Sequence, residues 1–291
     1  MTVRINRAVA LGIFDGVHLG HRSVIARAVG MKKQGLLPSV FTFKSSTLPA
    51  KQGRAVEYIY TDEYRERLLK GLGICDVINA DFSQIHTLSG ESFVKDILFS
   101  QLGTRYVVCG RDFRFGSNAS CGADELCRLC GELGINAEIA EDVMNDGENI
   151  SSRRIRELLK AGNVAKANEL LGENYILSAA VTDGNHLGRT INFPTINQPL
   201  PEGRLVMRYG VYRTVTHVSG RKYSSVTNVG VKPTVVGERA PLAETHLIGF
   251  SGDLYGQTAE VEFLSFVRPE RRFDSLDALK IQIEADIKKC I

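Results

Sequence analysis

The sequence predicts two domains of different fold class: an α/β domain with a parallel sheet, then a small all-β barrel or sandwich that ends in a helix. Its 291 residues amount to about two domains at roughly 150 residues each. The first part alternates short apolar runs with segments of helical spacing, and the last part is dense in β-rich runs separated by turns. We expect the domains to span 1–174 and 175–291.

The α/β prediction rests on a regular alternation. The apolar run VALGIF is followed by HRSVIARAVGMKK, in which Val24, Ile25 and Ala28 recur at helical spacing, and PSVFTF then predicts a second strand. Further strands are expected at DVINAD, RYVVCG and INAEIAED, and further helices at TDEYRERLLKGLG, SGESFVKDILFSQLG and GADELCRLCGELG. Such alternation favours a parallel sheet covered by helices on both faces, with ligands beyond the carboxyl ends of its strands.

The texture changes after Gly172. Two helical pieces, SSRRIRELLKAG and NVAKANELLG, precede this change. The β-rich runs that follow are YILSAAVTDG, GVYRTVTHV, RKYSSVTNVG, AETHLIGF and TAEVEFLSFV. Their density predicts a small antiparallel barrel or sandwich, and SLDALKIQIEADIKK predicts a terminal helix.

Composition narrows the classes of function. The chain is 43% hydrophobic and 24% charged, as expected of a globular protein, and it has no apolar run of the roughly 18 residues that a membrane span requires. A net charge of +3 is too small for a protein that coats nucleic acid. We therefore expect no nucleic-acid or membrane partner. Six cysteines spread over a long chain without a secretory signal favour a cytoplasmic location. We also expect a monomer or weak homo-oligomer.

The six cysteines include CRLC, Cys127 to Cys130, whose spacing suggests a metal. A structural zinc site needs four ligands, and no second cysteine or histidine pair completes one. We expect reduced structural thiols in a helix and no metal at these residues.

The stretch FDGVHLGH, residues 14–21, lies where a predicted strand gives way to a helix. Free amides at a helix start and the helix dipole favour a phosphate, and Gly16 and Gly20 let the backbone approach it. His18 and His21 could donate hydrogen bonds to phosphate oxygens as charge shifts. The alternative is a tight turn with satisfied imidazoles.

A second phosphate element is ISSRRIR, residues 150–156. Ser151 and Ser152 are capping residues at a helix start, and the guanidinium groups of Arg153, Arg154 and Arg156 that follow suit a triphosphate or pyrophosphate. A capped surface helix with solvated arginines is the alternative. Neither a Walker A pattern nor G-x-G-x-x-G occurs in the chain.

In the β-rich part, FPTIN places Thr195 and Asn197 two residues apart on an extended segment, hence on one face. Their hydroxyl and carbonyl oxygens are hard ligands that suit Mg²⁺ and its phosphates. A turn or strand edge without metal is the alternative.

Taken in order, FDGVHLGH, CGRDFRFG at 109–116 and ISSRRIR resemble the adenylyltransferase module of bacterial bifunctional riboflavin kinase/FAD synthetases. The segments LGRTINFPTINQ, AETHLIGF and RPERRF resemble the riboflavin kinase module of the same family. The resemblance covers essentially the whole chain. It implies a Rossmann-like nucleotidyltransferase domain at 1–174 and a riboflavin kinase barrel at 175–291.

The resemblance implies two reactions: phosphorylation of riboflavin to FMN by ATP, and adenylylation of FMN by ATP to give FAD and pyrophosphate, both with Mg²⁺. It implies that His18 and His21 act at the triphosphate and that Glu244 of ETHL is the general base of the kinase. The implied nucleotide-binding residues are Gly12, Phe14, Asp15, Gly16, His18, Gly20, His21, Asp112, Ser151, Ser152, Arg156, Gly188, Thr195 and Asn197. The implied flavin-binding residues are Phe113, Phe115, Arg268 and Arg272, and the implied Mg²⁺ ligands are Thr195 and Asn197.

Residue-level alternatives stay open. Asp112, Phe113 and Phe115 also suit a structural strand-end loop, Glu244 a solvent-facing strand position, and the arginines of RPERRF a solvated surface. The chain departs from the family pattern at Asn192, where glycine is usual, at Arg153, where threonine is usual, and in TFKSSTLPA. A chain with one working half, a flavin-binding protein without catalysis, and an adenylyltransferase for a smaller acceptor are the competing functions.

Overall fold

The computed structural model describes residues 5–49, 57–183, 193–233 and 239–290. By its internal contacts the chain divides into two compact units, Met1–Ser152 and Arg153–Ile291. Among the residues described, no helix combines the length and the apolar character that a membrane span needs.

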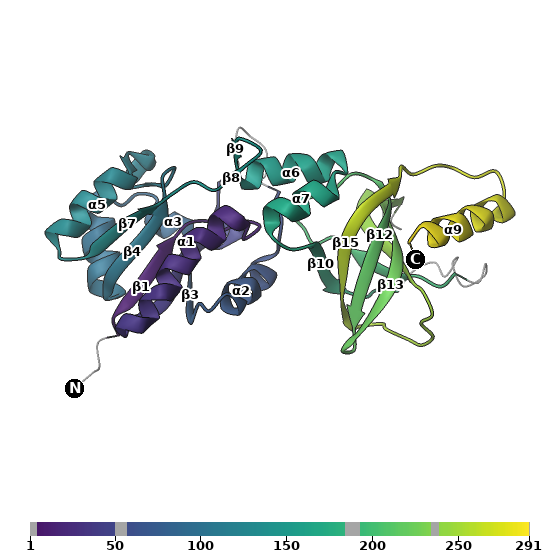
Figure 1. The fold of residues 1–291 in the computed structure, drawn as a ribbon, viewed down its shortest axis with the longest axis horizontal. Coiled ribbons are helices and arrows are strands. Elements are labelled where there is room, and N and C mark those ends of the chain that lie inside the picture. Colours follow the sequence, from purple (N-terminus) through teal and green to yellow (C-terminus); the bar gives the residue numbers. More distant parts are fainter. Residues whose placement is uncertain (1–4, 50–56, 184–192, 234–238, 291) are drawn as a thin grey trace. The chain divides into compact units, whose positions relative to one another are not determined.

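The first unit is built on a five-stranded parallel sheet (Figure 1) with the order β3-β2-β1-β4-β7. These strands are β1 (Arg7–Leu11), β2 (Leu37–Phe43), β3 (Asp76–Ala80), β4 (Thr104–Gly110) and β7 (Asn136–Ala140). All four pairings are parallel. The chain winds outward from β1 through β2 to β3, then returns to β4 beside β1. The order therefore reverses between β1 and β4, and ligands of open α/β sheets bind at such a switch point, beyond the strand ends.

Helices cover both faces of this sheet because successive residues of a strand point to opposite sides. Ala8 and Ala10 of β1 pack with helices α1 (Leu19–Gly30) and α2 (Asp62–Gly71). Val9 and Leu11 of β1 pack on the other face with the helical segment Phe93–Gln101 and helix α5 (Ala123–Glu132).

Shorter elements join these. They are the helical turns Met31–Gln34 and Ser45–Thr47, α3 (Phe82–Ile85), α4 (Gly90–Ser92), the turn Ser117–Ala119, and the small hairpins β5 (Arg114–Phe115) with β6 (Cys121–Gly122) and β8 (Met144–Asn145) with β9 (Glu148–Asn149). The segment Phe93–Gln101, expected as an ordinary helix, has π-helical hydrogen bonding.

The second unit contains α7 (Val164–Leu171), most of α6 (Ser152–Ala161), and a six-stranded antiparallel sheet with the order β10-β15-β12-β13-β14-β11. The strands are β10 (Tyr175–Ala180), β11 (Ile196–Pro199), β12 (Gly210–Val218), β13 (Arg221–Pro233), β14 (Arg239–Leu247) and β15 (Thr258–Arg268). An isolated bridge joins Thr182, just after β10, to Asn197 of β11, so the two edges of the sheet approach each other as in a partly closed barrel.

The terminal helix α9 (Leu276–Cys290) packs against β12 and β13. It is fastened by Asp286, whose carboxylate is almost fully buried and accepts hydrogen bonds of 2.7 to 3.2 Å from the guanidinium of Arg268 in β15. Leu276 at the start of the helix is exposed, whereas Ile287 near its end packs against the cluster that contains Val211 and Val226.

The fold class predicted from the sequence is confirmed: an α/β parallel-sheet domain precedes an antiparallel β domain with a terminal helix. The division by contacts falls at Ser152/Arg153, earlier than the expected domain limit at 174/175. The reason is that α7 packs against β10 and β15 of the second sheet. The limit at 174/175 stays a prediction about where the functional modules meet.

Candidate functional sites

His18 and His21 lie directly after β1, at the switch point of the parallel sheet. His18 is the N-cap of α1, and its Nδ1 accepts a hydrogen bond of 3.3 Å from the backbone N–H of His21. The two imidazole rings stack, with centroids 3.6 Å apart and planes inclined by 19°. Because Nδ1 of His18 is an acceptor here, its Nε2 carries the proton in the neutral ring and is a donor.

The pKa of His21 lies well below the usual value for histidine, first because burial disfavours the charged ring, and then because His18 and Arg65 add positive charge nearby. Its Nδ1 is buried and has no hydrogen-bond partner among the described residues. A buried polar atom without a partner is costly, and a ligand oxygen or proton-bearing group would satisfy it. The ring is therefore neutral near pH 7 and equipped to bind an incoming ligand.

The loop before His18 has an unusual backbone. Phe14, Gly16 and Val17 have φ values of +55°, +85° and +44°, and for a β-branched residue such as Val17 this left-handed conformation is strained. The side chains of Phe14 and Val17 are fully buried in the core, which holds the strained turn. Backbone strain that is held by surrounding structure gathers at functional sites.

Two further contacts fix the position of this loop. The carboxylate of Asp15 accepts a hydrogen bond of 2.9 Å from the backbone N–H of Ile59. The carbonyl oxygen of Asp15 accepts one of 2.8 Å from the hydroxyl of Ser152, the first residue of α6. At Gly20 a Cβ atom would lie 3.2 Å from the His18 ring and 3.5 Å from the carbonyl oxygen of Ile150, so glycine allows the segment before α6 to approach closely.

The structure thus brings the two sequence motifs together through Ser152 and Asp15. Ser151 is half-buried beside Ser152, and Arg156 follows one helical turn later in α6, four residues from Ser152 and thus on the same helix face. Gly12, expected at the nucleotide, leaves room for the ring of Phe14, which would lie 3.0 Å from a Cβ there.

Sequence reasoning missed Arg65. This arginine of α2 is buried, and its guanidinium donates hydrogen bonds to the carbonyl oxygens of Ile13 (3.3 Å) and Phe43 (2.8 Å) while pairing with Asp62 at 2.9 Å. It therefore fixes the backbone just after β1 and β2, and its positive charge helps to lower the pKa of His21. In the sequence, Asp62 and Arg65 look like an ordinary surface pair three residues apart on a helix.

The segment RDFRFG follows β4, the second strand at the switch point. Phe115 is buried and packs against Phe93 with centroids 5.6 Å apart, so it belongs to the hydrophobic core. Phe113 is half-buried and stacks on Phe115 at 5.7 Å, while Asp112 is exposed. Of these three residues, Phe113 and Asp112 present surface to a ligand, and the flavin-binding and nucleotide-binding roles remain predictions.

In the second unit, β11 and β14 place Asn197 directly opposite Glu244. Glu244 also lies opposite Asn228 of β13 on its other side. Thr245, the next residue, is fully buried and hydrogen-bonds to Thr227 at 2.9 Å inside the barrel. Because side chains alternate, Glu244, Asn197 and Asn228 share the other face of the sheet.

Thr195 lies two residues before Asn197 and thus on the same side of the chain. Its segment is held against β14 by His246, whose Nδ1 lies 2.8 Å from the carbonyl oxygen of Pro194. The structure therefore brings Asn197 and Glu244 to one face of the sheet, and Thr195 lies just before β11, so its place beside them stays a prediction. Gly188 and Asn192 lie outside the described residues.

The two arginines expected at the flavin differ in their surroundings. Arg268 is bonded to Asp286 of α9 and lies over the ring of Phe273 at 5.8 Å, which gives it a structural function. Arg272 is exposed. Their flavin-binding role stays a prediction.

Cys109 of β4 and Cys130 of α5 lie in the hydrophobic core of the first unit. Burial raises the pKa of the Cys109 and Cys130 thiols to about 12, so both are protonated near pH 7. All six cysteines are free thiols.

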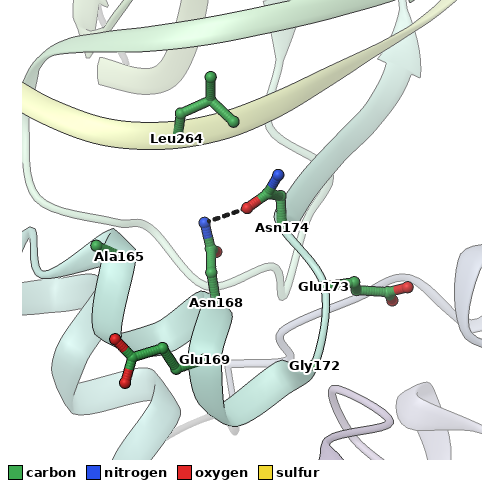
Figure 2. Close-up of a pocket in the computed structure, with 7 residues that line it drawn as sticks. All are labelled: Ala165, Asn168, Glu169, Gly172, Glu173, Asn174 and Leu264. Atoms are coloured by element: carbon green, nitrogen blue, oxygen red, sulfur yellow. Dashed lines mark hydrogen bonds between the residues drawn. The ribbon is translucent and has the colours of Figure 1, made fainter.

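A pocket of about 480 Å³ lies in the second unit (Figure 2), and none of the predicted site residues is among the residues that line it. In Figure 2, Asn168 of α7 donates a hydrogen bond of 2.8 Å to Asn174, and the same amide bonds to the carbonyl oxygen of Phe263. The lining asparagines thus join α7 to the sheet, which accounts for their polar groups structurally.

Two family models match the chain: FAD synthetase over residues 2–154 and riboflavin kinase over residues 171–291. A bifunctional riboflavin kinase/FMN adenylyltransferase from Listeria monocytogenes is 32% identical and covers 97% of this chain and 90% of its own. The Escherichia coli K12 protein of the same name is 34% identical over 96% of this chain and 90% of its own. A crystal structure described as a macrolide-efflux protein from Streptococcus pneumoniae is 31% identical, with a TM-score of 0.86 over 97% of this chain and 93% of its own.

A doubly wound sheet with histidines at its switch point suits a ligand at that edge, and the two family models place the chain among transferases with two catalytic domains. With matches that span both domains, the family is specific: the chain belongs to the bifunctional riboflavin kinases/FMN adenylyltransferases. The resemblance seen in the sequence motifs is thereby confirmed.

Proposed function

We propose that the loop after β1 and the start of α6 bind the triphosphate of ATP while FMN is adenylylated, and that the face of Glu244 carries the phosphorylation of riboflavin. Flavin and ATP are the substrates of this family of enzymes, which catalyse both reactions. The observation that supports the first assignment most is the buried, unsatisfied Nδ1 of His21 at the switch point.

In the adenylylation, a phosphate oxygen of FMN attacks the α-phosphorus of ATP, the new P–O bond forms, and the bond to pyrophosphate breaks. The FMN phosphate is already an anion, so the protein needs no side-chain nucleophile. His18 and His21 donate hydrogen bonds to the oxygens on which negative charge accumulates. Arg65 holds the loop and contributes positive potential without contacting the substrate.

Ser152 fixes the loop by its bond to Asp15, and Arg156 offers a guanidinium fork to the leaving pyrophosphate. Phe113 supplies an aromatic surface after β4 for the flavin or the adenine.

In the phosphorylation, Glu244 accepts the proton of the ribityl hydroxyl as its oxygen attacks the γ-phosphorus of ATP, and ADP leaves. A carboxylate that is half-buried between Asn197 and Asn228, on one face of the barrel, supports this role.

The residues on this face fit Mg²⁺, since the Thr195 hydroxyl, the Asn197 carbonyl and a carboxylate are the hard oxygen donors that it prefers. When bound, Mg²⁺ would neutralise negative charge on the phosphates. Thr195 and Asn197 are the proposed ligands.

We further propose that the protein works in the cytoplasm on small molecules alone, because both reactions consume ATP and nothing in the proposed chemistry needs a nucleic acid. We also propose that it is a monomer or a weak homo-oligomer.

The function is tested by incubating the purified protein with riboflavin, ATP and Mg²⁺ and separating riboflavin, FMN and FAD over time, beside a run that starts from FMN. FMN that rises first and FAD that follows is the expected result. FAD from the FMN start alone would mean an inactive kinase half, and no product from either start would favour a flavin-binding protein.

A further inference from the structure

Glu270, which no sequence argument singled out as functional, reaches the face of the barrel that carries Glu244. Its Oε1 accepts a hydrogen bond of 3.1 Å from Nδ2 of Asn228. Asn228 of β13 lies directly opposite Glu244 of β14 in the antiparallel register, and opposite residues of such strands have side chains in contact distance. Glu270 is thus one hydrogen bond away from the neighbour of the proposed base.

Strand β13 leaves space for the carboxylate of Glu270. Gly230 lies two residues after Asn228, hence on the same face, and it is buried. A Cβ atom at Gly230 would lie 2.1 Å from Oε1 of Glu270, far closer than two such atoms can approach. A glycine in the interior of a strand weakens it and often marks a close approach. Here the approaching group is the carboxylate of Glu270.

Glu270 is also held from behind, because the residues around it are fastened to α9. Arg268 binds Asp286, and Nη2 of Arg271 donates to Oε1 of Gln282, whose amide in turn donates to Asp286 at 2.7 Å. The segment between β15 and α9 is therefore anchored on both sides of Glu270. The contacts of Arg268 and Arg271 and the lack of a Cβ atom at Gly230 together hold the Glu270 carboxylate in one position, which a glutamate that only covered the surface would not require.

We propose that Glu270 and Asn228 form a positioning pair that holds the carboxylate of Glu244 in place for the phosphorylation of riboflavin. Glu270 fixes the orientation of the Asn228 amide by taking one of its N–H groups. The second N–H and the carbonyl oxygen of the Asn228 amide are then oriented toward the side chain of Glu244. This inference rests on the proposed role of Glu244.

The pair predicts a specific pattern of kinetics. Glu270→Ala should lower kcat for riboflavin phosphorylation by about 10- to 100-fold, since a misplacement near 1 Å costs up to about 100-fold, with a smaller change in the KM for ATP. Glu270→Gln keeps an acceptor oxygen of the same reach and should retain most of the activity. Asn228→Ala should match Glu270→Ala, and the double variant should be no slower than either, because coupled residues are not additive.

A fifth variant displaces the carboxylate of Glu270 without changing Glu270 itself. Gly230→Ala places a methyl group where Oε1 lies, so the end of the flexible Glu270 side chain must move away. We expect it to reproduce the kinetics of Glu270→Ala. Glu284→Ala, at an exposed carboxylate of α9, is the matched control and should behave as the unchanged protein.

The experiment measures kcat and KM for phosphorylation in the unchanged protein and in all six variants, the double variant included, with FAD formation from supplied FMN in the same samples as an internal measure of folding. The proposal is overturned if Glu270→Ala phosphorylates at the normal rate, if Glu270→Gln loses as much as Glu270→Ala, or if the effects of Glu270→Ala and Asn228→Ala multiply. Glu244→Gln is measured beside them: if it retains phosphorylation, the assignment of the base fails instead.

Discussion

The hydroxyl of Ser152 donates a hydrogen bond of 2.8 Å to the carbonyl oxygen of Asp15, 137 positions earlier in the chain. This bond joins the start of α6 to the strained loop that presents His18 and His21. Two motifs that the sequence could offer only as separate phosphate elements are therefore one structural feature.

Removing this bond should loosen the loop. We expect Ser152→Ala to lower the free energy of unfolding by about 1 kcal/mol, the usual value of one hydrogen bond, and to slow FAD formation while FMN formation stays unchanged. Chemical denaturation and the two product assays measure this. Equal slowing of both reactions would show that Ser152 does not act through the adenylylation loop. Ser117→Ala, in the turn Ser117–Ala119 after β5, is the control.

The two stacked histidines should act on one reaction only. His18→Ala and His21→Ala should each lower kcat for FMN adenylylation by about 10²- to 10³-fold, the range seen when one donor to a developing charge is lost. Riboflavin phosphorylation should not change. His86→Ala, at an exposed histidine, is the control. A His21→Ala protein that makes FAD at the normal rate would remove this histidine from the proposed site.

His21 should also make stability depend on pH. The pKa of His21 is lowered in the folded protein by burial and by the charges of His18 and Arg65, whereas in the unfolded chain the pKa of this histidine is about 6.5. Below that pH the unfolded chain binds more protons than the folded one, so the free energy of unfolding falls as the pH is lowered, by at most about 1.4 kcal/mol per pH unit.

Denaturation at pH 7.5, 6.5 and 5.5 without nucleotide tests this. The loss of stability on acidification should be smaller in His21→Asn than in the unchanged protein, and His86→Asn should leave it unaltered. Identical pH dependence in all three proteins would mean that His21 is not the depressed group.

Arg65 offers a test of the scaffold behind the site. Arg65→Met keeps much of the volume but leaves the carbonyl oxygens of Ile13 and Phe43 without their donor, so we expect a loss of about 3 kcal/mol in the free energy of unfolding. FAD formation should fall more than FMN formation, because Arg65 belongs to the first unit. Arg67→Met, on the same helix, is the control. Unchanged stability in Arg65→Met would contradict the bracing role.

Much of the fold could be predicted from local pattern. Apolar runs such as that of β4 and the helical spacing of α1 and α5 specify which elements form, and their alternation specifies a parallel sheet. The reversal of strand order beside β1 could not be read this way, because pairing between distant strands leaves no periodic signal in either one.

The residues of the candidate sites also divide into those that sequence motifs identify and those that only the structure identifies. Motifs in the sequence identified His18, Ser152 and Glu244 as candidates. The structure joins Ser152 to the loop before His18 and places Glu244 opposite Asn197, and the chemical roles of the three residues stay predictions. Arg65 and Glu270 escaped because each lies among surface-like charges in the sequence, and only burial or a missing Cβ distinguishes them. Phe115 was expected at the flavin, yet its ring lies in the core, since an aromatic residue after a strand suits either place.

The central claim is that one chain carries two independent transfer sites. The most direct measurement compares Glu244→Gln and His21→Asn in parallel, each assayed for FMN from riboflavin and for FAD from supplied FMN. We predict a reciprocal result: Glu244→Gln loses FMN formation and keeps FAD formation, and His21→Asn does the reverse. Loss of both activities in either variant, with the protein still folded, would contradict the account.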